Sequence, residues 1–282
     1  MLTPFLRFYS MLMISLFALA LSSTHSDSFN EAIFAYRSGN YSKAFKLFKI
    51  HAERGNVNAQ YNLMIMYDLG QGVTESQVKA SKWCLKAAEQ GLPEAQHSIG
   101  LRYYYGQGVK KDNIQAAEWQ TKAAEQGNQF AQFVLGDYYS RGIGVPVDYK
   151  QALKWYKKSA SQGNTDAQNN IGSLYENGLG VGKDFKEAIK WYARAAFGEN
   201  PYAQASLGNL YAKGQGVVQD NVHALMWYLL ALERFKPEEM KKKIKEDRDE
   251  LMSLMTAEEI SEAEKLASDW KSNKLVEPLL EN

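Results

Sequence analysis

The stretch AQNNIGSLYENGLGV, residues 167–181, and the preceding stretch DYKQALKWYKKSASQG, residues 148–163, decide the fold, because their pattern returns along the chain. An Ala-Gln pair, a tyrosine and a Gly-x-Gly-Val segment recur every 36 residues over five units, without insertion or deletion. Tryptophan keeps the same step, at Trp83, Trp119, Trp155, Trp191 and Trp227. A fixed period in the range of about 20–50 residues is the signature of a repeat architecture.

Each unit predicts two helices. Ala59, Leu63 and Tyr67 lie at i, i+4 and i+8, which places them on one helical face. The paired glycines that follow end this helix, since helix ends and tight loops often need a positive φ. An aspartate such as Asp148 then caps a second helix. The pattern predicts an all-α fold, a right-handed α/α superhelical solenoid of about six helix pairs with a C-terminal helical cap, in which the five tryptophans form the repeat core.

The N-terminal segment has the pattern of a secretory signal peptide. Arg7 is its one charge, residues 8–21 are almost wholly apolar, and small residues suited to cleavage follow. We expect an exported protein, periplasmic or secreted; an uncleaved anchor and a buried first helix are the alternatives. The expected boundaries are a signal peptide over 1–22, a degenerate N-terminal capping helix pair over 23–54, five repeats over 55–235, a C-terminal helical cap over 236–272 and a flexible tail over 273–282.

The composition narrows the functional classes. The 282 residues include 33 Lys and Arg against 32 Asp and Glu, so the formal net charge is +1. This balance gives no electrostatic reason to expect nucleic acid or an anionic membrane as a partner. The single cysteine, Cys84, excludes an intramolecular disulfide and a multi-thiolate metal site. The four histidines share no ligand spacing, so we expect no metal and no cofactor. No second apolar run of spanning length follows the first, so we expect no membrane span after signal cleavage.

The recurring motif A-Q-x-x-[LI]-G-x-x-Y-x-x-G-x-G-V-x-x-D-x-x-x-A-x-x-W-Y-x-x-[AS]-A-x-x-G resembles the Sel1-like repeat family, a relative of tetratricopeptide repeats, over about residues 55–235. The resemblance implies an α/α superhelix that binds other proteins or peptides, and bacterial relatives that are often exported adaptors of envelope or host-interaction processes. Four positions depart from the motif: Met64 replaces its glycine, Ser76 its aspartate, and Cys84 and Gln120 its tyrosine.

One motif could support an enzyme instead. Ser76-Gln77-Val78-Lys79 matches the S-x-x-K of serine acylases. However, Ser76 occupies the N-cap position that aspartate fills in other repeats, and neither S-D-N nor K-T-G accompanies it. We therefore expect no catalysis, with a penicillin-binding or hydrolytic envelope enzyme using Ser76 and Lys79 as a remote alternative. We also expect Cys84 to be a packed free thiol, and the tryptophans to be core residues with no basic stripe beside them.

Function should then reside in the surface. In tetratricopeptide-like stacks the first helix of each pair lines the concave side, and exchangeable aromatic residues there are typical binding anchors. By this analogy the partner-binding candidates are Tyr61, Ile65, His97, Leu101, Tyr104, Tyr105, Phe130, Phe133, Asp137, Arg141, Asn169 and Ser173. We expect a non-catalytic scaffold or adaptor of the cell envelope that binds a peptide or helix of a partner protein, with a secreted effector or host-interaction factor as the alternative. The mixed charges of residues 241–250 predict a solvated helix face.

Overall fold

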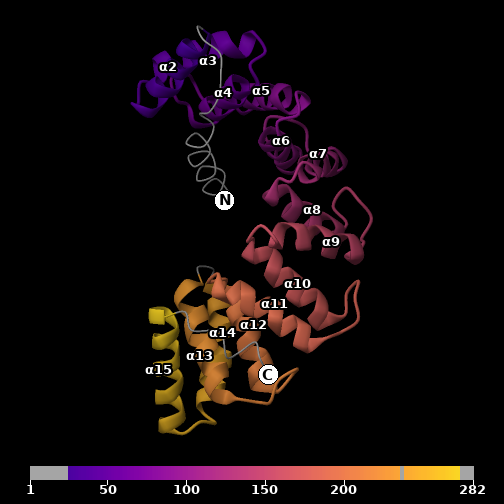
Figure 1. Ribbon diagram of the computed structural model, residues 1–282, viewed down its shortest axis with the longest axis vertical. Helices are drawn as coiled ribbons and strands as arrows, with labels where there is room; N and C mark the ends of the chain where they lie inside the picture. The colour runs from indigo at the N-terminus through magenta and orange to yellow at the C-terminus, as the bar shows by residue number, and fades with distance from the viewer. Residues whose placement is uncertain (1–24, 236–237, 274–282) are drawn as a thin grey trace. The chain divides into compact units, whose positions relative to one another are not determined.

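A computed structural model describes residues 25–235 and 238–273, and every regular element in these ranges is an α-helix. The predicted signal peptide and most of the predicted tail lie outside the described residues. Figure 1 shows the helices in chain order. They are α2 (His25–Arg37), α3 (Tyr41–Glu53), α4 (Val57–Leu69), α5 (Gln77–Glu89), α6 (Pro93–Tyr105), α7 (Asn113–Glu125), α8 (Gln129–Arg141), α9 (Tyr149–Ala160), α10 (Thr165–Asn177), α11 (Phe185–Phe197), α12 (Pro201–Lys213), α13 (Asn221–Arg234), α14 (Glu238–Met252) and α15 (Ala257–Asn273).

The chain forms two compact units, which we describe separately. Unit 1 comprises residues up to Leu135 together with Ile143–Pro146, and unit 2 comprises Gly136–Gly142 and the chain from Val147 onwards. Within each unit, the two helices of a repeat pack against each other, and the second helix packs against the first helix of the next repeat. The predicted all-α solenoid of helix pairs is confirmed.

Short polar side chains begin the helices. Asp148 and Asp184 accept hydrogen bonds from the first-turn backbone N–H groups of α9 and α11, as predicted. Asn164 does the same for α10, accepting from Ala167 N at 2.9 Å. Asparagine caps on the first helices were not anticipated, although asparagine also stands at the equivalent positions 56, 128 and 200.

In four of the five Ala-Gln pairs the glutamine donates a hydrogen bond to the preceding helix. Gln96 in α6 is buried and donates from Nε2 to the carbonyl of Ala88, near the end of α5, at 3.2 Å. Its own Oε1 accepts from Gln126 of the next repeat at 2.7 Å. The Ala88 carbonyl also accepts from the Gly91 N–H at 3.0 Å, so the glutamine adds a second hydrogen bond at the end of α5 and ties α6 to it.

The mid-helix glycine makes room for the tyrosine of the second helix. A Cβ atom placed on Gly172 would lie 2.7 Å from two ring carbons of Tyr192. The pairs Gly136–Tyr156 and Gly208–Tyr228 repeat this contact. Two repeats lack this tyrosine. In the repeat with Cys84, Met64 replaces the glycine of the first helix, and in the next repeat Gly100 lies against the Gln120 side chain.

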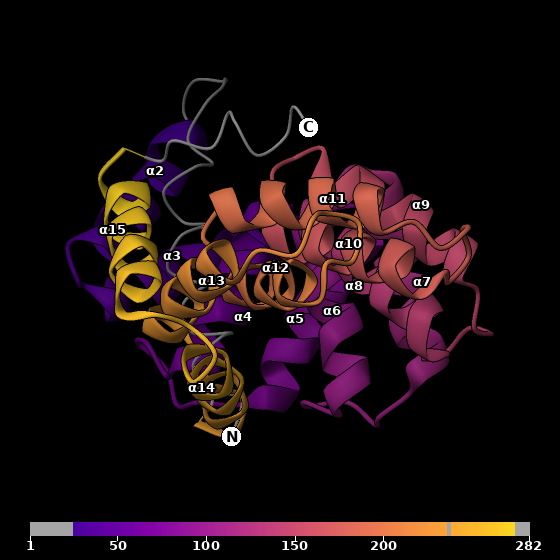
Figure 2. The same ribbon diagram turned by 90° about the horizontal axis from the view of Figure 1, so that it is seen from below.

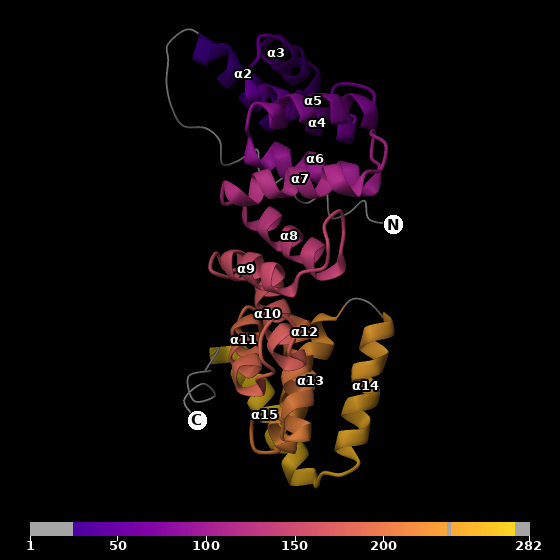
Figure 3. The same ribbon diagram turned by 90° about the vertical axis from the view of Figure 1, so that its right-hand side faces the viewer.

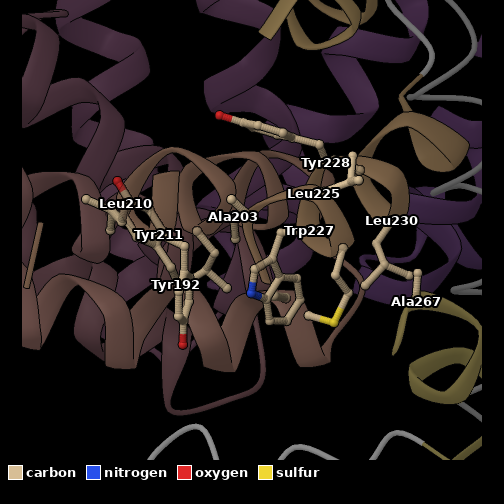
Figure 4. Close-up of a cluster of buried hydrophobic side chains, with 14 of the residues drawn as sticks. Tyr192, Ala203, Leu210, Tyr211, Leu225, Trp227, Tyr228, Leu230 and Ala267 are labelled. Carbon is tan, nitrogen blue, oxygen red and sulfur yellow. The ribbon is translucent and has the colours of Figure 1, made fainter. Parts of the chain in front are cut away.

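The tryptophans differ in burial. Trp119, Trp155 and Trp227 are buried, whereas Trp83 and Trp191 keep a partly exposed edge. In four repeats a cation three residues later lies over the indole, as Lys158 does over Trp155 at 4.3 Å. In the last repeat Leu230 takes the cation's position, near Trp227 (Figure 4). Helix α15 covers Trp227, and the centroid of its Trp270 ring lies 4.8 Å from that of Trp227. The apolar replacement therefore marks the repeat that the C-terminal cap shields.

Two helices follow the last repeat, and α15 packs beside α13 (Figures 1 and 2). Thr256 and Glu259 form a capping box at the start of α15, with Glu259 accepting from Thr256 N at 2.8 Å. In α14 only Ile244 and Leu251 are buried. Its charges pair along the exposed surface, as in Lys243–Asp247 at 2.8 Å, which agrees with the predicted solvated face.

Candidate protein-binding surface

Partly exposed aromatic rings of unit 1 link successive first helices. The Tyr61 hydroxyl of α4 lies 3.4 Å from the Ser98 hydroxyl of α6. Next to Ser98, the His97 ring lies 6.4 Å from the ring of Phe130 in α8. Each of these three aromatic residues keeps part of its surface exposed. We call Tyr61, His97 and Phe130, with the partly exposed Leu101 and Phe133, the aromatic strip.

A departure from the repeat pattern orients His97. Gln120 stands in the tyrosine position of α7 and is fully buried. His97 Nδ1 donates to Gln120 Oε1 at 2.8 Å, and Gln120 Nε2 donates back to the His97 carbonyl at 3.1 Å. Burial lowers the pKa of His97 below its usual 6.5, so the imidazole is neutral at physiological pH. The strip therefore has an oriented, uncharged imidazole at its centre.

Other candidates of unit 1 divide between the surface and the core. Tyr104 and Tyr105 form an edge-to-face pair at 4.8 Å, and Tyr105 is 44% exposed. The Lys111 ammonium lies over the Tyr104 ring at 5.6 Å. Ile65 is only 1% exposed and packs in the hydrophobic core, so it does not line a surface. The helical face that the analogy assigned to the groove is turned inward at this position.

The candidates of unit 2 are polar and take part in internal hydrogen bonds. Asp137 accepts from the Tyr156 hydroxyl at 2.5 Å and from Asn170 Nδ2 at 3.2 Å. Burial raises the pKa of Asp137. Asn169 donates to Asn170, and Ser173 accepts from Asn177, while Arg141 is exposed. Asp137 therefore serves the tyrosine position of its own repeat, and its carboxylate is already engaged.

The comparison with family models matches six consecutive segments to the Sel1 repeat, residues 35–56, 57–92, 93–128, 129–164, 165–196 and 201–234. This chain belongs to the Sel1 repeat family. Sel1 repeat proteins generally mediate protein–protein interactions, and the family is typically a non-catalytic scaffold.

Two crystal structures of Sel1-like repeat proteins are similar to this one. A Sel1 repeat protein from Oxalobacter formigenes is 36% identical, with a TM-score of 0.71, over 75% of this chain and 87% of that chain. A protective antigen present in uropathogenic Escherichia coli strains is 32% identical, with a TM-score of 0.76, over 85% of this chain. The match spans about half of the antigen, 52% of its chain. No curated protein matches the sequence.

The possible catalytic residues Ser76, Lys79 and Cys84 have structural roles in their repeat. Ser76 caps α5, its hydroxyl accepting from Lys79 N at 3.3 Å, and the Lys79 ammonium lies over the Tyr67 ring. Cys84 is fully buried, its thiol donating to the Ala95 carbonyl at 3.4 Å, and burial raises its pKa to about 12. A thiol that stays protonated at neutral pH is a weak nucleophile. Among the described residues, no group of three or more metal-binding side chains occurs and no helix is long and apolar enough to span a membrane.

One buried charge was missed in the sequence analysis. Arg102 of α6 is 2% exposed, at a frame position that Leu174 and Leu210 occupy in later repeats. It forms an ion pair with Asp68 and donates to the Ser81 hydroxyl at 3.0 Å. Burial raises the pKa of Asp68 despite the adjacent guanidinium. A charged residue in an apolar frame position was the available signal, and it marks an interior network rather than a surface site.

Proposed function

We propose that this Sel1 repeat protein is a non-catalytic adaptor that binds a helix or extended segment of a partner protein through the aromatic strip of unit 1. The observation that supports this most is the continuity of the strip across three first helices, α4, α6 and α8. Aromatic side chains with part of their surface exposed are the usual energetic anchors of protein interfaces, because they bury a large area with few rotatable bonds.

The repeat frame does not require these residues. At the position of Tyr61 and His97 the later repeats have Phe133, Asn169 and Ala205. Aromatic residues at this position therefore occur only in unit 1, although a polar or a small residue can occupy the same position of the repeat. Aromatic side chains that the fold does not demand at this position are available to contact a partner.

We propose further that the protein is exported to the cell envelope, on the pattern of residues 1–22. A secreted, host-facing role is the second candidate, and it is favoured by the description of one 32% identical relative as a protective antigen. Fusing residues 1–30 to alkaline phosphatase, which is active only after export, tests this point. An inactive but intact fusion contradicts export, and recovery of the native protein from the culture medium selects the secreted role.

The binding surface is tested by a double substitution with a matched control. Phe130→Ala with Phe133→Ala removes two partly exposed rings of the aromatic strip, whereas Val78→Ala with Ile114→Ala removes two side chains of the second helices that are 68% and 61% exposed. The partner is first obtained by chemical crosslinking and pull-down from the native envelope fraction. Only the first pair should weaken its binding, by about tenfold or more. Unchanged binding, with circular dichroism showing an intact fold, contradicts the proposal.

A further inference from the structure

The outer surface of unit 2 has a concentration of positive charge that is unrelated to the aromatic strip. The exposed face of α9 presents lysines at i, i+4 and i+8, and α11 presents cations at the equivalent positions one repeat later. The two helices belong to successive repeats, and α10 packs against both (Figure 3). We call these six residues the basic face: Lys150, Lys154, Lys158, Lys186, Lys190 and Arg194.

The repeat frame does not require these cations. Other repeats fill the first position of the row with aliphatic residues, and they vary the second and third among lysine, glutamate and apolar residues. The expectation that no basic stripe accompanies the tryptophans is therefore wrong for α9 and α11. The equivalent residues elsewhere are Val78, Lys82 and Lys86, then Ile114, Glu118 and Lys122, and finally Val222, Met226 and Leu230.

Little negative charge balances the basic face within the described part of the chain. Its one ion pair there is Lys190–Glu187, at 3.4 Å. Lys158 and Arg194 instead lie over the indoles of Trp155 and Trp191, at 4.3 and 4.7 Å. Such contacts hold the side chains in position but leave their net charge intact.

The acidic residues near the basic face cap helices or accept hydrogen bonds from neutral side chains. Asp148 and Asp184 cap the N-termini of α9 and α11. In α10, Glu176 accepts from the Tyr192 hydroxyl at 2.7 Å, and Asp166 accepts from Asn200 at 2.7 Å. None of these four carboxylates forms an ion pair with the basic face in the described chain, and the six cations outnumber the four together with Glu187, so the face keeps an excess of positive charge.

We propose that the basic face binds an Asp- and Glu-rich helical segment of a partner protein, as a second interaction surface. Along each row the cations recur every four residues, a rise of about 6 Å, which equals the spacing of glutamates at i and i+4 on an acidic helix. Five of the six cations are lysines, which act as point charges and can pair with carboxylates without a fixed relative orientation.

The neighbouring aromatic rings argue against the other polyanions. Trp155 is 6% exposed and Trp191 lies beneath Arg194, so neither ring offers a free face for a nucleic-acid base. The six positions contain no apolar side chain that could enter a bilayer. A carboxylate-rich protein segment needs neither base stacking nor insertion into a bilayer, so the charges present here are sufficient to bind it.

Binding is tested with a fluorescein-labelled, 18-residue Glu/Ala peptide that carries glutamate at i, i+4 and i+8, measured by fluorescence anisotropy at 50 and 200 mM NaCl. Lys150→Glu with Lys186→Glu reverses two charges of the basic face. Both residues lie in the first turn of a helix, where an added acid is favourable to the helix dipole, so folding should persist. Lys242→Glu with Lys245→Glu on exposed α14 changes the net charge equally and is the control.

The proposal predicts salt-sensitive binding that falls about tenfold in the basic-face variant and less than about twofold in the control. Equal loss in both variants shows a net-charge effect and overturns it. Tighter binding of a 20-nucleotide single strand, or of vesicles with 30% phosphatidylglycerol, than of the peptide also overturns it and identifies the other class of polyanion. Because the variants leave the aromatic strip untouched, failure here does not bear on the proposed adaptor function.

Discussion

Replacing Gly172 by alanine tests the packing rule that glycine in the first helix admits tyrosine from the second. The new Cβ atom would lie 2.7 Å from Cδ1 and from Cε1 of Tyr192, and 3.0 Å from its Cγ. Carbon atoms normally meet at about 3.5–4.0 Å, so the ring must move by about 1 Å. Tyr192 has no free space for this movement, because it is 2% exposed and its hydroxyl is bonded to Glu176.

The expected effect on the free energy of unfolding is the difference of two opposing contributions. Alanine in place of a mid-helix glycine normally stabilises by about 1 kcal/mol. Forcing extra atoms into a packed core costs about 1–3 kcal/mol, and three close contacts with a held ring favour the upper end. We expect Gly172→Ala to destabilise the protein by about 1–2 kcal/mol.

Urea unfolding followed by circular dichroism gives this value, and a double-mutant cycle identifies its cause. In a Tyr192→Cys background, which mimics the cysteine of the Cys84 repeat, the ring is gone and Gly172→Ala should stabilise by about 1 kcal/mol. The coupling between the two sites is then about 2–3 kcal/mol. If Gly172→Ala has the same effect in both backgrounds, the glycine does not serve the tyrosine and the packing rule is wrong.

Three further predictions follow from single residues. Trp155→Ala should lower the free energy of unfolding by about 3–5 kcal/mol, and an unchanged value in urea unfolding would contradict its place in the core. Glu199 is the one non-glycine residue of the described chain with a positive φ, 64°. Gly163→Glu at the equivalent position should lower the free energy of unfolding by about 1 kcal/mol. Glu199→Gly should raise it by less, because the ion pair with Arg234 is lost. The pKa of His97 is lowered in the folded state, so the unfolded chain takes up the proton first and stability is lost as pH falls below about 6.5. His97→Phe should remove this part of the pH dependence, measured by unfolding curves at pH 7.5 and 5.5. The same pH dependence in the variant and the wild type would contradict this prediction.

Features that repeat and act locally could be predicted from the sequence. Asp148 caps its helix through its own first turn, and each Gly-x-Gly ends a helix within the same unit, so both follow from residue type and spacing. Gly172 belongs to the recurring motif, and the structure identifies the group that approaches it as the Tyr192 ring. The glutamine after each core alanine was recognised as part of the motif, but its bond to the preceding helix depends on how repeats stack.

Features that depend on neighbouring repeats were not predictable in the same way. Ile65 lies on the expected helix face, yet its surroundings bury it. Arg102 enters the core because Asp68 and Ser81 of the preceding repeat supply its partners, and no single repeat contains that information. The analogy with tetratricopeptide repeats fixes a helix face only approximately, so it placed buried and exposed positions in one set.

The basic face could not be recognised from the net charge of the whole chain. A net charge of +1 over 282 residues suggests no charged surface. The acids that balance it lie elsewhere, and α15 alone carries Glu258, Glu259, Glu262, Glu264 and Asp269 against two lysines. Charge summed over a repeat chain therefore says little about any one face, whereas comparison of equivalent positions between repeats does.

The adaptor proposal is tested most directly by site-specific photocrosslinking. p-Benzoylphenylalanine replaces Phe133 in the aromatic strip, and in a second variant it replaces Val78, which is 68% exposed on α5 of the same unit. Irradiation in the native envelope should attach one reproducible partner through position 133 and leave position 78 without it. Crosslinking of the same partner from position 78 alone, or equally from both positions, would contradict binding through the aromatic strip.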